Sequence, residues 1–174
     1  MGYFDKDQPR VGVFVDVQNM FYAAKDRYAS RLDYIKLLDL TVGPRHLVVA
    51  YAYIVQIPEI DQSSFLSLLE HNGYRIKTKD LRLRGDGSAK GDWDVGIAID
   101  VIDTICDSER QIDTLVLLSG DGDFDLLLRR VTRDQKIKTI VYGAASLSAK
   151  SLKDAASEFR PIEGNLLMKK PNRD

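Results

Sequence analysis

Apolar residues recur along the chain with two different periods. Runs that are apolar at nearly every position are typical of strands buried on both faces, and such runs lie at 11–17, 46–55, 113–119 and 137–143. The segment 74–84 alternates apolar and polar residues, as a half-exposed strand does, and 158–163 is a candidate for one more short strand. Between these segments the apolar spacing is helical, which predicts helices over 19–28, 33–41, 61–73, 92–106, 123–134 and 146–156.

Strands that alternate with helices of this length are typical of βαβ units. They predict an α/β domain with three layers, in which a mostly parallel, Rossmann-like sheet is covered by helices on both faces. Because crossovers between parallel strands are right-handed, few strand orders remain, and we expect 3-2-1-4-5. The sequence contains no repeat or linker, so we expect a single domain over 11–164, between a flexible N-terminus at 1–10 and a C-terminal tail at 165–174.

Composition narrows the class of protein. The chain has 174 residues, of which 44% are hydrophobic, which is enough for a proper core. No apolar stretch approaches the roughly 20 residues that span a bilayer, and the first residues contain no apolar signal-peptide core, so we expect a cytoplasmic protein with no membrane partner. The single cysteine, Cys106, excludes an internal disulfide and a Cys-based zinc cluster, and its apolar surroundings predict a buried side chain.

Carboxylates follow two of the predicted strands. Asp16 ends the first strand, with Asn19 three residues further on, and Asp121 and Asp123 come directly after the strand at 113–119. In the order 3-2-1-4-5 these two strands are neighbours. Ligands bind beyond the carboxyl ends of parallel strands where the strand order reverses, so we expect these four side chains to converge there.

The helix at 92–106 begins with two more acids. One of them can cap the helix while the other faces the strand ends, and we assign the cap to Asp92 and the site to Asp94. Asp125, inside the next helix, is expected to be a solvated first-turn acid or a group behind the ligands. Asp100 and Asp103 are expected on the solvated face of their helix.

Carboxylates that converge repel one another unless they take up protons or hold a cation. Oxygen ligands without Cys or His favour hard cations such as Mg²⁺ or Mn²⁺, and such ions most often act on phosphates. A calcium loop that starts at Asp121 is excluded, because its sixth and twelfth positions need Gly and Glu but hold Leu126 and Thr132.

Basic residues are concentrated just before Asp92, although the net charge of the chain is only −1. This segment is either an ordinary edge strand protected by charge or a track for a phosphate backbone that leads to the metal. We favour the track, whose candidate contacts are Lys77, Lys79, Arg82, Arg84 and Lys90.

Three motifs carry a family resemblance. In chain order, "VFVDVQN", "KGDWDVGIAID" and "LLSGDGDFDLLLRRV", followed by "IVYG", resemble the NYN domain, the LabA-like branch of the PIN-like nucleases, over roughly residues 11–143. The resemblance implies a PIN-like sheet and an acidic Mg²⁺ or Mn²⁺ site that cleaves RNA. It also implies roles for individual residues: Asp16 as the first metal-binding acid with Asn19 as its hydrogen-bonding partner, Asp94 as the acid on the helix, Asp121 and Asp123 as the last pair, and Ser119 as the residue that steadies the turn.

These observations favour a metal-dependent ribonuclease that acts on RNA, in particular single-stranded RNA. Its catalytic and metal-binding acids would be Asp16, Asp94, Asp121 and Asp123, with Asn19 orienting a carboxylate or water and Lys90 contacting the scissile phosphate. The alternative is a PIN-like module without catalysis that binds RNA or a regulatory partner. A phosphohydrolase for small substrates is disfavoured, since neither an Asp-x-Asp nucleophile motif at Asp16 nor a P-loop is present. A homodimer through an exposed helix face stays open.

Overall fold

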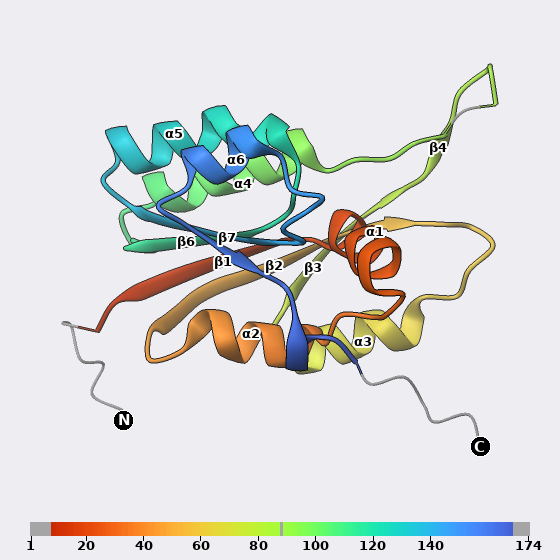
Figure 1. The fold of residues 1–174 in the computed structure, drawn as a ribbon, viewed down its shortest axis with the longest axis horizontal. Helices are drawn as coiled ribbons and strands as arrows, with labels where there is room; N and C mark the ends of the chain where they lie inside the picture. The colour runs from red at the N-terminus through yellow and green to blue at the C-terminus, as the bar shows by residue number, and fades with distance from the viewer. Residues whose placement is uncertain (1–7, 88, 169–174) are drawn as a thin grey trace.

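Six parallel strands form the central sheet in the computed structural model, which describes residues 8–87 and 89–168 (Figure 1). Their order is β3-β2-β1-β6-β7-β8. The bounds are β1 Arg10–Asp16, β2 His46–Gln56, β3 Arg75–Asp80, β6 Thr114–Leu118, β7 Lys138–Gly143 and β8 Glu158–Pro161. The predicted α/β fold with a mostly parallel sheet is therefore confirmed.

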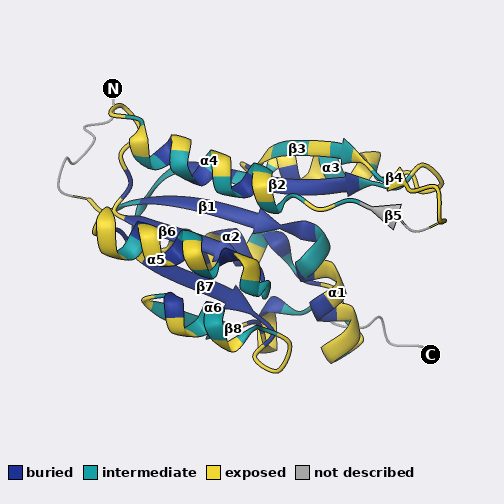
Figure 2. Ribbon diagram, turned by 90° about the horizontal axis from the view of Figure 1, so that it is seen from above, coloured by how far each residue is buried: buried dark blue, intermediate teal, exposed yellow. Residues whose placement is uncertain are grey.

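Helices cover both faces of the sheet and complete the three layers (Figure 1). One hydrophobic core packs against α1 Val17–Tyr28, α2 Tyr34–Val42 and α3 Ser63–His71. A second core, on the other face, packs against α4 Asp94–Cys106, α5 Asp125–Asp134 and α6 Lys150–Ala155. In β1, Val13 and Val15 belong to the first core and Phe14 to the second, which explains why this central strand has no polar side chain between Val11 and Val15 (Figure 2).

The sheet differs in two details from the prediction. The first five strands follow the order 3-2-1-4-5, but the segment at 158–163 supplies a sixth, β8, at the edge next to β7. The predicted strand at 74–84 is two strands, because β3 ends at Asp80 and β4 Arg82–Leu83 pairs antiparallel with β5 Ala89–Lys90. Gly87, with a φ of 81°, lies in the turn of this hairpin, which projects away from the sheet (Figure 1).

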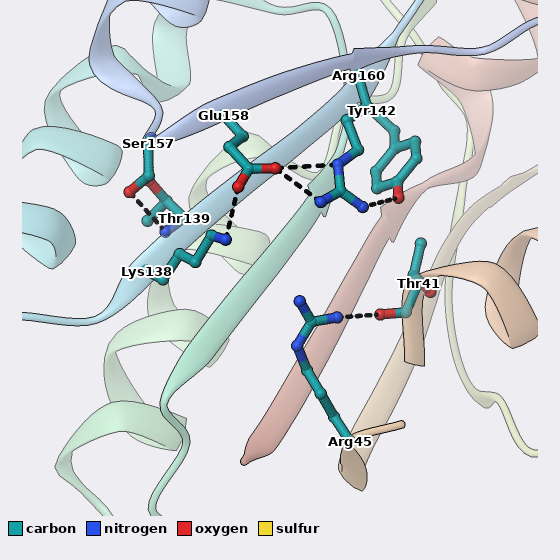
Figure 3. Close-up of polar contacts among 8 residues, drawn as sticks. All are labelled: Thr41, Arg45, Lys138, Thr139, Tyr142, Ser157, Glu158 and Arg160. Carbon is teal, nitrogen blue, oxygen red and sulfur yellow. Dashed lines mark hydrogen bonds and ion pairs between the residues drawn. The ribbon is translucent and has the colours of Figure 1, made fainter. Parts of the chain in front are cut away.

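Charged side chains line the β8 edge. Glu158 pairs with Lys138 at 2.5 Å and with Arg160 at 2.7 Å, and Arg160 also donates to the Tyr142 hydroxyl at 3.1 Å (Figure 3). The hydrogen bonds from Lys138 and Arg160 hold the pKa of Glu158 below its ordinary value. Charges of this kind discourage another strand from pairing with the open edge.

The domain continues slightly beyond the predicted boundary at 164. Leu166, in the 3₁₀ turn Gly164–Leu166, is buried in the first core, and the Met168 amide donates to the Arg31 carbonyl at 2.8 Å. Residues 165–168 therefore pack on the domain. The rest of the predicted tail, 169–174, and residues 1–7 of the predicted N-terminus lie outside the described residues. Within the described ranges, no helix is both long enough and apolar enough to cross a membrane.

Two predictions for α4 were wrong. Cys106 is exposed at the end of the helix and not buried. Asp100 is not on the solvated face: its side chain is only 15% exposed, and it accepts hydrogen bonds from the Tyr53 hydroxyl at 2.8 Å and from Lys77 Nζ at 2.7 Å. This carboxylate thus joins α4 to two strands of the sheet.

Replacing Asp100 with alanine is expected to lower the free energy of unfolding by about 1–3 kcal/mol, because the substitution leaves the buried Tyr53 hydroxyl and the Lys77 ammonium without their acceptor. Asp103→Ala, at an exposed position one turn further along α4, is the matched control and should change stability by less than about 0.5 kcal/mol. Urea unfolding measures both values. Equal stability of the two variants would show that the Asp100 contacts contribute nothing.

Candidate metal centre

Three carboxylates meet beyond the carboxyl end of β6. Asp94, Asp121 and Asp123 each offer one oxygen atom, and these three atoms lie within 4.8 Å of one another. Asp94 is the first residue of α4, whereas the other two flank Gly122 in the loop after β6. Oδ1 of Asp121 accepts a hydrogen bond from the Asp123 amide at 2.9 Å, which fixes the conformation of the loop.

A fourth carboxylate lies deeper, at the end of β1. The side chain of Asp16 lines the same cavity as Asp94 and Asp121, yet the residue is only 7% exposed. Its Oδ1 accepts from the Asn19 amide at 3.3 Å, and its Oδ2 accepts from the Ser119 hydroxyl at 3.4 Å. Burial, together with the charges of Asp121 and Asp92, raises the pKa of Asp16 from its ordinary 3.8 to about 6, although the hydrogen bonds from Asn19 and Ser119 lower it.

The pKa of Asp94 is raised for the same reasons. The partial burial of this residue, together with the negative charges of Asp121, Asp92, Asp16 and Asp123, raises its pKa to about 6. No lysine or arginine lines this cavity within the part of the chain that the structure describes. The negative charge is therefore not balanced by a basic side chain of the cavity wall, and an oxygen-only set of donors at this spacing fits a hard divalent cation.

Gly120 fixes the acidic loop between two other elements. Its amide donates to Oδ1 of Asn19 in α1 at 2.9 Å, and its carbonyl accepts from the Ala149 amide, just before α6, at 3.0 Å. A Cβ atom at this position would lie 3.0 Å from Ser148 Oγ and 3.2 Å from Ser148 Cα, closer than ordinary contact. A larger residue at position 120 would therefore push the loop and the β7–α6 turn slightly apart. Ser119 contributes from the other side, since its hydroxyl accepts from the Asp121 amide at 3.2 Å.

The acids form the floor of a cavity of about 340 Å³. Helix α1 lines the cavity through Tyr22 and Asp26, and the β7–α6 turn lines it through Leu147. The sequence prediction did not include these three residues. Tyr22 and Asp26 follow Asn19 at helical intervals of three and four, and this spacing was a usable signal, but nothing in the sequence marks Leu147.

The remaining acids lie around the cluster. Asp92 lines the cavity, and its Oδ1 accepts from the Asp94 amide at 3.4 Å, so it lies at the start of α4 beside the site. Asp125 is the first residue of α5 and pairs with Arg129 at 3.8 Å. It does not belong to the group of three acids whose oxygens meet.

The basic residues of the predicted track lie in different surroundings in the structure. Lys77 pairs with Asp100, and the Lys79 ammonium lies over the Trp93 ring, 4.4 Å from its centroid. Arg82 and Arg84 are exposed on the hairpin that connects the end of β3 with the start of α4. Lys90 belongs to β5, but its side chain lies outside the described part of the structure.

Comparison with known proteins identifies the family. The family model of the NYN domain matches residues 10–163, which is most of the chain. The chain belongs to the NYN domain family.

Two relatives support this assignment. The Low amplitude and bright protein LabA of Synechococcus elongatus is 30% identical to this NYN domain over 158 residues, covering 86% of this chain and 82% of the relative. A crystal structure of a protein of unknown function from Vibrio parahaemolyticus matches with a TM-score of 0.84 and 34% identity, covering 95% of this chain and 99% of that one. The resemblance to the LabA-like NYN domains is thus confirmed, and with it the fold.

The raised pKa of Asp16 predicts how stability depends on pH when no divalent cation is present. The folded state binds this proton more tightly than the unfolded state, so the stabilisation is complete below about pH 4 and is lost as pH rises through about 6. In EDTA, Asp16→Asn should therefore be more stable than the wild type by roughly 1–3 kcal/mol at neutral pH, and this gain should vanish towards pH 4.

Denaturant unfolding over this pH range measures the effect, with Asp103→Asn, at an exposed position on α4, as the matched control. A wild type whose stability does not fall between about pH 4 and 7, or an Asp16→Asn variant that is no more stable at neutral pH, would contradict the prediction.

Proposed function

We propose that this NYN domain is a Mg²⁺- or Mn²⁺-dependent ribonuclease that hydrolyses phosphodiester bonds in single-stranded RNA. The observation that supports this best is the meeting of Asp94, Asp121 and Asp123 in a cavity whose floor also contains the buried Asp16. A domain without a cationic ligand has no physical reason to hold so many mutually repelling carboxylates together.

The geometry of the oxygen atoms supports a division of roles among the acids. Asp94, Asp121 and Asp123 would hold the cation directly, and the charge of Asp16 would add to the attraction from behind them. When bound, a divalent cation supplies a Lewis acid for the phosphate oxygens and a hydroxide nucleophile at neutral pH. Asn19 and Ser119 hold the acids in position relative to one another. Asn19 forms hydrogen bonds with both Asp16 and Gly120, and Ser119 forms them with both Asp16 and Asp121.

The approach of RNA would depend on charges outside the cavity. The floor is negative, so it repels a phosphate unless a cation lies between them. Arg82 and Arg84 are exposed on the hairpin, which begins at the same edge of the sheet and supplies positive charge there (Figure 1). Phosphate contacts of this kind make binding weaken with salt and do not depend on base sequence.

The pKa values of Asp16 and Asp94 link cation binding to pH, because carboxylates must lose their protons to act as ligands. At about pH 7.5 a saturating concentration of Mn²⁺ should raise the melting temperature by roughly 5–10 °C, the shift expected when the ligand is at about 100 times its Kd. Near pH 5 protons compete with the cation, and the shift should shrink.

Differential scanning calorimetry measures this shift for the wild type, Asp121→Asn and Asp103→Asn. We expect Asp121→Asn to lose most of the shift and Asp103→Asn, at an exposed position on α4, to keep it. Equal shifts in all three proteins would place the bound cation elsewhere.

Cleavage of single-stranded RNA tests the reaction itself. Asp121→Asn and Asp16→Asn should fold but lose Mn²⁺-dependent cleavage by about 100-fold or more in kcat/KM, the scale on which removal of one group that stabilises the transition state acts. Asp103→Asn should cleave like the wild type. Gel analysis of labelled RNA with Mn²⁺, Mg²⁺ and EDTA gives the rates, and circular dichroism confirms that each variant is folded.

Equal cleavage by the wild type and both variants would end the ribonuclease proposal. Binding of RNA that survives EDTA, without turnover in any metal, would favour the alternative of a PIN-like module that binds RNA or a regulatory partner.

A further inference from the structure

Two large, exposed apolar side chains line the cavity that contains the acids, and they come from different elements. Tyr22 of α1 is 47% exposed, and Leu147 of the β7–α6 turn is 52% exposed. Large apolar side chains with this much exposed surface indicate a ligand-binding site when they line the same cavity. Here they share one cavity with Asp16, Asp94 and Asp121 of the proposed reaction centre.

The charges of the cavity limit which chemical groups can bind against Tyr22 and Leu147. Asp26 follows Tyr22 one turn further along α1, the floor consists of carboxylates, and none of the described lining residues is basic. A free phosphate would be repelled from this lining, whereas an uncharged planar group could cover the Tyr22 ring. A nucleobase is such a group, and stacking on aromatic rings is how bases of single-stranded RNA are commonly held.

Hydrogen bonds that meet at one residue tie these two elements to the acidic loop. Gly120 binds Asn19 of α1 through its amide and Ala149, next to the β7–α6 turn, through its carbonyl. Within that turn the amides of Leu147 and Ser148 both donate to the Ala144 carbonyl, at 3.0 and 2.9 Å. Because both elements are tied to the loop that carries Asp121, a group that binds against Tyr22 and Leu147 has a defined position relative to the acids.

We propose that Tyr22 and Leu147 form a nucleobase-binding subsite, in which the base next to the scissile phosphate stacks on the Tyr22 ring. This inference rests on the proposed ribonuclease function and adds to it a residue that positions the substrate. The volume of about 340 Å³ falls in the range of pockets for small ligands, so the space suffices for one base but not for a duplex. The subsite therefore also selects single-stranded RNA.

Three variants separate stacking from other effects. Tyr22→Ala removes the ring, and Tyr22→Phe keeps the ring without its hydroxyl. Phe21→Leu is the matched control, because Phe21 has the same 47% exposure on the same helix and contacts the Tyr22 ring, but does not line the cavity. The probe is a short fluorescein-labelled single-stranded RNA, and its Kd is measured by fluorescence anisotropy with Ca²⁺ in place of Mg²⁺ or Mn²⁺.

We expect Tyr22→Ala to raise the Kd by about 5- to 150-fold, the range found when one stacked base loses its aromatic partner, while Tyr22→Phe and Phe21→Leu stay within about twofold. A second set of probes lacks one base at a time. At one position the missing base should weaken binding to the wild type by a similar factor, but hardly affect Tyr22→Ala, because the partner ring is already absent. A purely structural role of Tyr22 would not produce this dependence on one base.

Three outcomes would overturn the subsite: no RNA binding by the wild type, equal losses in Tyr22→Ala and Phe21→Leu, or equal sensitivity of the wild type and Tyr22→Ala to every missing base. Cleavage assays separate this proposal from the ribonuclease proposal. If the wild type cleaves RNA and Tyr22→Ala leaves KM unchanged, the proposal of a nucleobase-binding subsite is refuted, whereas the proposal of a ribonuclease is supported. If no metal supports cleavage but the base-specific effect of Tyr22 persists in Ca²⁺, the nucleobase-binding subsite is supported, whereas the ribonuclease proposal is refuted.

Discussion

The parallel pairing of β1 with β6 decides where the chemistry of this domain lies. Val15 pairs with Leu118 near the ends of these strands, so Asp16 and Ser119 leave the sheet side by side. The following loop carries Asp121 and Asp123 to Asp94 at the start of α4. These carboxylates repel one another in a partly buried cavity, and burial together with this repulsion raises the pKa of Asp16 and of Asp94. A bound cation would offset this repulsion, because each carboxylate would then be attracted to the ion.

The rest of the fold holds that arrangement in place and surrounds it with different kinds of surface. Two apolar cores fix the sheet from both faces, and the hydrogen bonds of Gly120 tie the acidic loop to α1 and to the β7–α6 turn. The cavity with the acids is also lined by the exposed Tyr22 and Leu147, and the hairpin after β3 carries exposed arginines. A strand of RNA offers matching chemistry, with phosphates for a cation, a backbone for arginine and planar bases for an aromatic ring.

Sequence alone predicted the elements whose pattern has a single interpretation. Continuous apolar runs at 11–17 and 113–119 fit only buried strands here, and their ends placed Asp16 and Asp121 at one edge of the sheet. The pattern at 74–84 was ambiguous, because an alternating segment fits one long strand as well as a strand followed by a hairpin. In α4 apolar residues occupy several sides of the helix, and Val95 and Ile99 are exposed, so periodicity could not identify the buried face. The contact of Lys77 with Asp100 depends on which strand lies beside α4. The lining of the cavity depends on the path of the β7–α6 turn. Neither arrangement can be predicted from the local sequence pattern.

The most direct measurement of the central claim is anomalous scattering from a crystal soaked in Mn²⁺. If the acids at the strand ends hold a divalent cation, the anomalous map contains a peak between the carboxylates of Asp94, Asp121 and Asp123, within ligand distance of all three. A soaked crystal with no peak at this position, while the three carboxylates keep their arrangement, would contradict the claim that their repulsion is offset by a metal ion.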